Sequence, residues 1–336
     1  MDLSTSYMGL KLSNPLVASA SPLSHTVEGV RRLADAGVGA VVLHSLFEEQ
    51  IQEEAVLNAQ LVDAGAESFA ESLSYFPSAV EDEPGPGRHL SLVERSAATV
   101  DVPVIASLNC VTPGRWTEYA HAMQEAGAAA IELNIYYVSG DPTIPGRDVE
   151  QRYVDVLEHV KAAVTVPVAV KLGPYFSSTG EIALRLEQAG ADALVLFNRF
   201  MQPTIDPETL TVAPAVALSS RADALLPETW IALLRSNVRC ALAATSGVED
   251  PADIARYLLA GADVVMTASA LLRHGPEHAT VLLNGLSAWM ARKGFQSLDD
   301  LRGMLSLAPG TDAEAYERAG YVTGLRAANI RAYRPW

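Results

Sequence analysis

Two short segments combine small and polar residues at positions where the backbone could hold an anion. They read TSG at 245–247 and TAS at 267–269, and each lies between an apolar run and a helical pattern. Small side chains let backbone N–H groups approach a phosphate, and the start of a helix adds the favourable end of its dipole. The two segments predict a phosphate site, with ordinary short turns as the alternative.

Three polar side chains at the ends of apolar runs could contact a heteroaromatic ring. Lys171, in the run VPVAVKLGPYF, would place an ammonium beside an anion or an electron-rich ring, although a solvated lysine is the alternative. Asn109 and Asn134 follow two other apolar runs and offer both donors and acceptors, although either could cap the next turn. If these runs are strands of one sheet, the three side chains lie at one end of it.

A repeating pattern along the chain supplies the elements that would position these residues. An amphipathic stretch, a glycine-containing turn and a short apolar run follow one another at 33–43, 123–134, 186–198 and 258–266. The glycine suits the C-terminus of a helix, and the apolar run suits a strand that is buried on both faces. A second form replaces the glycine turn with VPV at 102–104 and 166–168, where a proline at the start of a strand loses no ladder hydrogen bond.

Eight strands are predicted, with helical patterns between most of them, and this alternation favours an α/β (β/α)8 TIM barrel over an open sheet. They are expected near 15–20, 39–43, 103–108, 129–135, 167–172, 192–197, 239–244 and 262–266. We predict a single barrel domain over 1–336 with inserted loops after strands 2 and 6, at 44–88 and 198–226. The second loop contains TLTVAPAVAL, which alternates enough to form a hairpin, whereas partial disorder at 80–88 is left open.

Composition excludes several classes of protein. The net charge of −16 repels phosphate backbones and anionic lipid surfaces, so nucleic acid and membranes are poor partners. Cys110 and Cys240 lie far apart without a CxxC pattern, which argues against a disulfide scaffold and against a metal site. Without an apolar targeting segment at the N-terminus or a long apolar run, we expect a cytoplasmic protein.

Four ordered motifs resemble the dihydroorotate dehydrogenase family over nearly the whole chain. They are NPLVASAS at 14–21, IELN at 131–134, VAVKLGPYF at 168–176 and the long segment at 275–303. This family consists of barrels that use flavin mononucleotide (FMN) to oxidise dihydroorotate to orotate in pyrimidine biosynthesis. The resemblance implies an FMN site made by Ala18, Ser19, Asn109, Asn134, Lys171, Ser219, Ser220, Ser246, Gly247, Ala268 and Ser269.

The part of the family pattern that handles substrate is altered. Tyr137 stands where the family has its cysteine or serine base, and His44 replaces the lysine expected after strand 2. The asparagine-rich segment that holds the orotate ring reads SLSYFP at 72–77, and the asparagine pair after strand 6 is reduced to Asn198. Dihydroorotate is therefore expected to be a poor substrate.

The altered residues suggest chemistry on a different small molecule. A phenol is a poor base at neutral pH but can donate a proton to a carbanion, and an imidazole can transfer protons near neutrality. We expect an FMN-dependent oxidoreductase that acts on a CH–CH or C=C group, with Tyr137 favoured over His44 as proton donor. The alternatives are a flavin-binding barrel without turnover and a phosphate-binding lyase or synthase without flavin, and a homodimer is left open.

Overall fold

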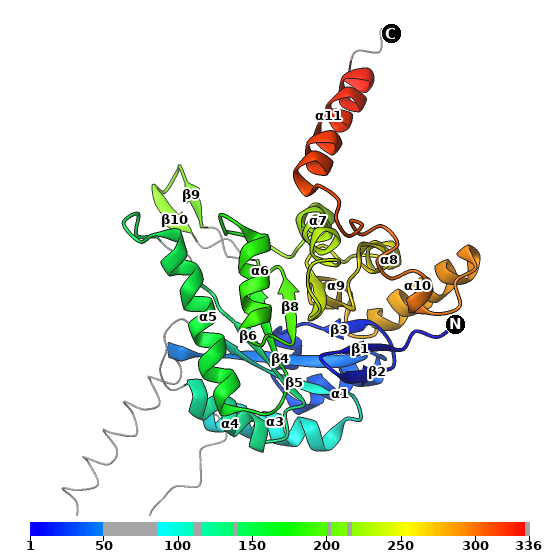
Figure 1. The fold of residues 1–336 in the computed structure, drawn as a ribbon. Coiled ribbons are helices and arrows are strands. Elements are labelled where there is room, and N and C mark those ends of the chain that lie inside the picture. The colour runs from blue at the N-terminus through cyan, green and yellow to red at the C-terminus, as the bar shows by residue number, and fades with distance from the viewer. Residues whose placement is uncertain (50–85, 110–115, 138–139, 200–202, 214–216, 333–336) are drawn as a thin grey trace, which may run out of the picture.

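Eight parallel strands form a closed barrel, as the sequence predicted (Figure 1). The computed structural model describes residues 1–49, 86–109, 116–137, 140–199, 203–213 and 217–332. The strands pair in the order β11-β12-β3-β4-β5-β6-β7-β8, and β11 also pairs with β8 to complete the ring. Their bounds are β3 Leu16–Ala18, β4 Ala40–Phe47, β5 Val104–Asn109, β6 Ala130–Asn134, β7 Val168–Leu172, β8 Ala193–Leu196, β11 Ala241–Thr245 and β12 Val264–Thr267.

Helices surround the barrel because alternate side chains of each strand face outward and are apolar. In β6, for example, Ile131 and Leu133 pack in the large outer core, whereas Ala130 belongs to the smaller cluster inside the barrel. The helices are α1 Val27–Asp35, α3 Pro86–Thr99, α4 Trp116–Glu125, α5 Gly146–Ala163, α6 Thr179–Gln188, α7 Leu225–Leu234, α8 Pro251–Ala260, α9 Ser269–His274 and α10 His278–Lys293. Burial on both faces explains why the strands read as continuous apolar runs.

The glycine turns of the sequence repeat lie at the junctions between helices and strands, as predicted. Gly127 and Gly261 have φ of 95° and 122°, a range that other residues rarely adopt. At Gly261 a Cβ would also lie 2.6 Å from a side-chain carbon of Arg235. The chain can therefore reverse from α8 into β12 only with glycine at this position.

A hairpin before the first barrel strand closes the N-terminal end of the barrel, and the sequence analysis did not predict it. Strands β1 (Thr5–Tyr7) and β2 (Leu10–Leu12) pair in antiparallel fashion. Tyr7, Met8 and Leu12 belong to the buried cluster inside the barrel, where most strand residues are alanine or valine. Large side chains from the hairpin thus fill space that the small strand residues leave.

The excursion at 198–226 contains a hairpin, formed by β9 (Thr204–Asp206) and β10 (Thr211–Ala213). Only its second strand lies in TLTVAPAVAL, the segment from which a hairpin was predicted, and the first strand precedes that segment. Its apolar side chains Ile205 and Val212 are paired across the strands and exposed.

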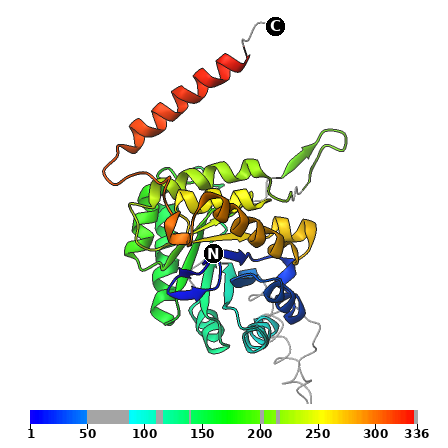
Figure 2. The same ribbon diagram turned by 90° about the vertical axis from the view of Figure 1, so that its right-hand side faces the viewer.

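The predictions at 72–77 and for most of 80–88 lie outside the described residues. The C-terminal helix α11 (Ala313–Ala332) extends away from the barrel (Figure 2). In the described part of the chain no helix is both long and apolar enough to cross a membrane.

Packing inside the barrel predicts the cost of truncating Tyr7. This ring is 1% exposed, and its hydroxyl has no hydrogen-bond partner among the described residues. Tyr7→Ala should lower the free energy of unfolding by about 3–5 kcal/mol, as for other large aromatic truncations. Tyr7→Phe should cost less than about 1 kcal/mol, because it removes only the unpaired hydroxyl. Urea unfolding measures the free energy of unfolding of both variants. Equal decreases in Tyr7→Ala and Tyr7→Phe would contradict the conclusion that the ring fills the barrel interior.

Candidate functional site

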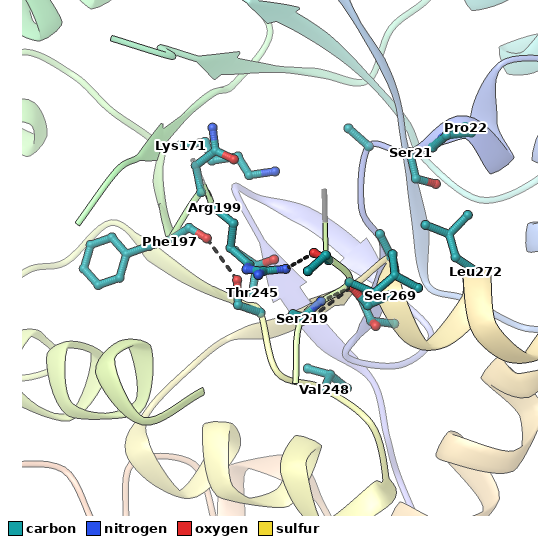
Figure 3. Close-up of a pocket in the computed structure, with 17 residues that line it drawn as sticks. Ser21, Pro22, Lys171, Phe197, Arg199, Ser219, Thr245, Val248, Ser269 and Leu272 are labelled. Atoms are coloured by element: carbon teal, nitrogen blue, oxygen red, sulfur yellow. Dashed lines mark hydrogen bonds between the residues drawn. The ribbon is translucent and has the colours of Figure 1, made fainter. Parts of the chain in front are cut away.

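A cavity of about 260 Å³ lies at the C-terminal end of the barrel, where the strand ends meet (Figure 3). It is bounded by residues that follow β3, β8, β11 and β12 and by Lys171 in β7. Ligands of such barrels bind at this end because the loops that follow the strands converge there. The lining comprises Ala20, Ser21, Pro22, Lys171, Phe197, Asn198, Arg199, Ala217, Leu218, Ser219, Thr245, Ser246, Val248, Thr267, Ala268, Ser269 and Leu272.

One side of the cavity is made by three serines from separate segments. The backbone N–H and the hydroxyl of Ser219 both donate to Oγ of Ser269, at 3.0 Å and 2.9 Å. Arg273 donates to the carbonyl oxygen of Ser219 at 2.8 Å and so anchors that segment. Ser246 completes this side after β11, and the hydroxyl of Tyr257 donates to its carbonyl oxygen at 2.7 Å. The arrangement brings small polar side chains together on one side of the cavity, where their hydroxyls bond to one another and to the Phe197 carbonyl oxygen.

The turn at Ser246 and Gly247 has a backbone conformation that few sequences accept. Both residues have positive φ, 84° and 67°. A Cβ at Gly247 would lie 2.6 Å from the backbone nitrogen of Ala224. Glycine is needed here because the segment with Ser220 and Ala224 packs against the turn, and Gly247 itself does not line the cavity.

Lys171 forms the other side of the cavity and is paired with a carboxylate inside the barrel. Its Nζ lies 3.4 Å from Oε1 of Glu132, and the two side chains are 8% and 1% exposed. A buried ion pair at the edge of a cavity places a fixed ammonium against any bound ring or anion. The alternative of a solvated lysine is therefore not what the structure shows.

A polar network connects Asn134 to the cavity, whereas Asn109 only neighbours Asn134 in the sheet. Asn198, which lines the cavity, donates to Oδ1 of Asn134 at 2.7 Å, and Asn134 reaches Oγ of Ser45 at 3.4 Å. Ser45 in turn shares a 2.8 Å hydrogen bond with Ser107. Asn109 is buried and lies beside Asn134 in the β5–β6 ladder, without lining the cavity.

The remaining predicted ligand residues lie near the cavity without lining it. Ala18 is buried at the end of β3, and the N–H of Ser19 donates to the carbonyl oxygen of Thr267 at 3.0 Å. Ser220 caps the short helix η2 (Arg221–Ala224), and its N–H donates to Asp223 at 2.7 Å. These residues therefore pack behind the residues that line the cavity.

Arg199 lines the cavity and was not singled out from the sequence. Its guanidinium donates to the carbonyl oxygen of Ala217 at 2.7 Å and lies 3.8 Å from Asp223. Figure 3 shows it among the side chains that line the cavity. The sequence could have indicated Arg199, because it is a basic residue directly after Asn198 near the end of a predicted strand. Lys171 was identified by the same kind of position.

Neither predicted catalytic side chain lines the cavity. The ring of Tyr137 packs against the outer core, and the Arg152 guanidinium from α5 lies 4.0 Å from its centroid. His44 was expected after strand 2 and instead lies within β4, because the strand continues past a register shift between Val42 and Ser45. This shift turns Ser45 toward Ser107 and leaves His44 on the outside of the barrel.

His44 belongs to a cluster of three histidines between β4 and the helix layer. Its ring lies 4.0 Å from the ring of His25 and 4.9 Å from that of His89, and its Nδ1 is 3.4 Å from the Ser24 carbonyl oxygen. Burial, followed by the neighbouring histidines, lowers the pKa of His89 to about 3 and that of His44 to about 4. Both rings are therefore neutral at pH 7. Within the described residues no group of three or more candidate ligands is arranged to hold a metal ion.

The fold and the cavity place the protein among the (β/α)8 barrels that bind ligands at the carboxyl ends of their strands. Residues 2–290 match the family described as dihydroorotate dehydrogenase, and the chain belongs to this family. It is thus an oxidoreductase of the dihydroorotate dehydrogenase type, a class of flavoproteins.

Individual relatives are similar over most of their length. The catalytic subunit of dihydroorotate dehydrogenase B (NAD(+)) from Methanothermobacter thermautotrophicus is 29% identical over 321 residues, covering 90% of this chain and 98% of that protein. Subunit PreA of the NAD-dependent dihydropyrimidine dehydrogenase from Escherichia coli is 25% identical over 342 residues, covering 93% and 79%. A putative dihydroorotate dehydrogenase A (fumarate) from Aeropyrum pernix is 27% identical over 311 residues, covering 90% and 97%.

The histidine cluster predicts how stability depends on pH. Because the folded-state pKa of His89 lies below the unfolded value of about 6.5, the unfolded chain binds more protons as the pH falls. Stability should therefore be full above pH 6.5 and decline toward pH 3. Between pH 6.5 and pH 5, the free energy of unfolding should fall by about 1.5 kcal/mol less in His89→Leu than in the wild type, because leucine cannot titrate. Urea unfolding at both pH values measures this difference, and parallel losses would refute it.

Proposed function

We propose that the protein is an FMN-dependent oxidoreductase acting on a CH–CH or C=C group of a small molecule, with a substrate site that differs from that of dihydroorotate-oxidising members. One observation carries the proposal. A single cavity at the C-terminal end of the barrel has small polar groups on one side and the paired ammonium of Lys171 on the other. A phosphorylated flavin needs both kinds of group.

The residues present fit FMN. Ser219, Ser246 and Ser269 would hold the phosphate, since their segments approach one another at the cavity. Lys171 would face the electron-rich part of the ring. When bound, FMN supplies two-electron chemistry between donor and acceptor. The polypeptide supplies orientation, charge and a proton.

We propose Tyr137 as the proton donor in preference to His44. The ring of His44 lies outside the barrel and is neutral at pH 7, so it can neither reach the cavity nor act as an imidazolium there. Tyr137 follows β6 at the cavity end of the barrel, although its ring contacts Arg152 in the present arrangement. Proton donation by Tyr137 requires its side chain to leave this contact and turn toward the substrate.

The alternative of a flavin-binding barrel without turnover is favoured by one observation, that neither candidate side chain lines the cavity. Reduction of bound flavin by a small-molecule donor separates the two proposals. We also propose a cytoplasmic location and a homodimer, for which the exposed Ile205 and Val212 in the β9–β10 hairpin would offer an apolar surface.

Flavin binding tests the proposed function directly. FMN should co-purify with the protein or raise its melting temperature when added. Lys171→Ala should weaken FMN binding or lower the reduction potential, because a cation near the ring stabilises the more negative reduced form. Absorbance of the heat-released supernatant and a redox titration measure these effects. A colourless protein that shows no thermal shift with added FMN would overturn the cofactor assignment.

Proton donation can be tested with any unsaturated molecule that reoxidises the reduced wild-type protein under anaerobic conditions. Tyr137→Phe keeps the ring and removes only the hydroxyl, so FMN should remain bound while reoxidation slows by roughly a hundredfold, as expected for loss of a general acid. Stopped-flow absorbance measures the rate. His44→Gln is the matched control and should react like the wild type. A slow His44→Gln beside an unaffected Tyr137→Phe would reverse the assignment.

A further inference from the structure

Glu132 is a fully buried carboxylate inside a barrel that is otherwise lined mainly by small apolar side chains. It lies in β6, between Ser107 of β5 and Ala169 of β7 in the barrel ladders. Its relative exposure is 0%, and its Oε2 has no hydrogen-bond partner among the described residues. An isolated charge in such surroundings is very costly, so this carboxylate requires a compensating group.

Lys171 is the cation that compensates Glu132. Its Nζ lies 3.4 Å from Oε1 of Glu132, and within the described chain this is the ion pair that Glu132 forms. Lys171 also lines the cavity, whereas Glu132 lies behind it, inside the barrel. The ammonium therefore has a carboxylate on its inner side and the ligand space on its outer side.

Tyr7 is a titratable group near Glu132 that does not compete with Lys171. Tyr7 enters the interior cluster from the N-terminal hairpin, and burial followed by the charge of Glu132 raises the pKa of its hydroxyl well above the ordinary value. Tyr7 remains a neutral phenol and cannot supply positive charge. The ammonium of Lys171 is consequently held by Glu132, and Glu132 is balanced by Lys171.

We propose that Glu132 is a positioning residue that holds the Lys171 ammonium against the flavin and sets the net charge that the flavin meets. The proposal rests on the proposed function, since it concerns the cavity assigned to FMN. A paired ammonium stabilises negative charge on the ring less than an unpaired one would. Glu132 should therefore limit how strongly the protein favours reduced over oxidised flavin.

Glu132→Gln preserves the shape of the side chain and removes its charge. With Lys171 no longer compensated, the ratio of affinities for reduced and oxidised FMN should increase at least tenfold, a rise of about 30 mV in the two-electron potential. The control is Glu150→Gln, which removes another buried carboxylate, 3.6 Å from Arg185, in helix α5. The control should change the ratio less than twofold. An unchanged ratio in Glu132→Gln would overturn the proposal.

A double-variant cycle tests whether Glu132 acts through Lys171. In a Lys171→Met background, Glu132→Gln should change the affinity ratio less than threefold, because the ammonium that it positions is gone. The double variant removes both charges, and replacement of a whole buried pair is tolerated better than loss of one partner. It should therefore fold even if Glu132→Gln alone does not. A tenfold or larger effect in the methionine background would show that Glu132 acts without Lys171.

A measurement without flavin separates failure of this proposal from failure of the proposed function. Reductive methylation of the flavin-free protein, followed by peptide mass spectrometry, reports how freely the Lys171 amine reacts. Labelling of Lys171 should be at least threefold faster in Glu132→Gln than in the wild type and unchanged in Glu150→Gln. If FMN does not bind but this difference is found, the cofactor assignment fails and the positioning of Lys171 stands. Equal labelling in all three proteins would refute the positioning.

Discussion

The pairing of β12 with β3 is the constraint on which the candidate site depends, because it joins the last strand of the barrel to the first. Thr267 lies opposite Ala18 in this ladder, and the N–H of Ser19 continues it by donating to the Thr267 carbonyl oxygen. The cavity is lined from both sides of the seam, by Ala20 after β3 and by Ser269 after β12. Segments separated by most of the chain therefore form one binding surface only when the barrel closes.

Local groups must hold an anionic ligand against an unfavourable overall charge. The chain carries a net charge of −16, which repels a phosphate at long range. At the cavity, Lys171 is fixed by Glu132, and Arg199 is fixed by a backbone carbonyl and by Asp223. Charges held at defined positions in a partly dry site act more strongly than charges spread over the surface.

The two halves of the family pattern have different structural support. Several groups assigned to the cofactor, Lys171, Ser219, Ser246 and Ser269 among them, line the cavity, and Asn134 connects to it through Asn198. The residues that replace the substrate machinery, Tyr137 and His44, pack toward the helix layer. This difference supports a preserved flavin barrel with a modified reaction partner.

The sequence by itself determined the barrel, because strands buried on both faces must read as apolar runs and a glycine turn or a proline marks the start of most of them. It also identified Lys171 and the serine-containing loops, since residues directly after barrel strands share one end of the fold. It could not determine where His44 points, because a register shift in β4 sets that direction, nor that Tyr7 fills the barrel interior. Only the tertiary structure paired Glu132 with Lys171, because their contact depends on the alignment of two strands that are separated by a helix in the chain.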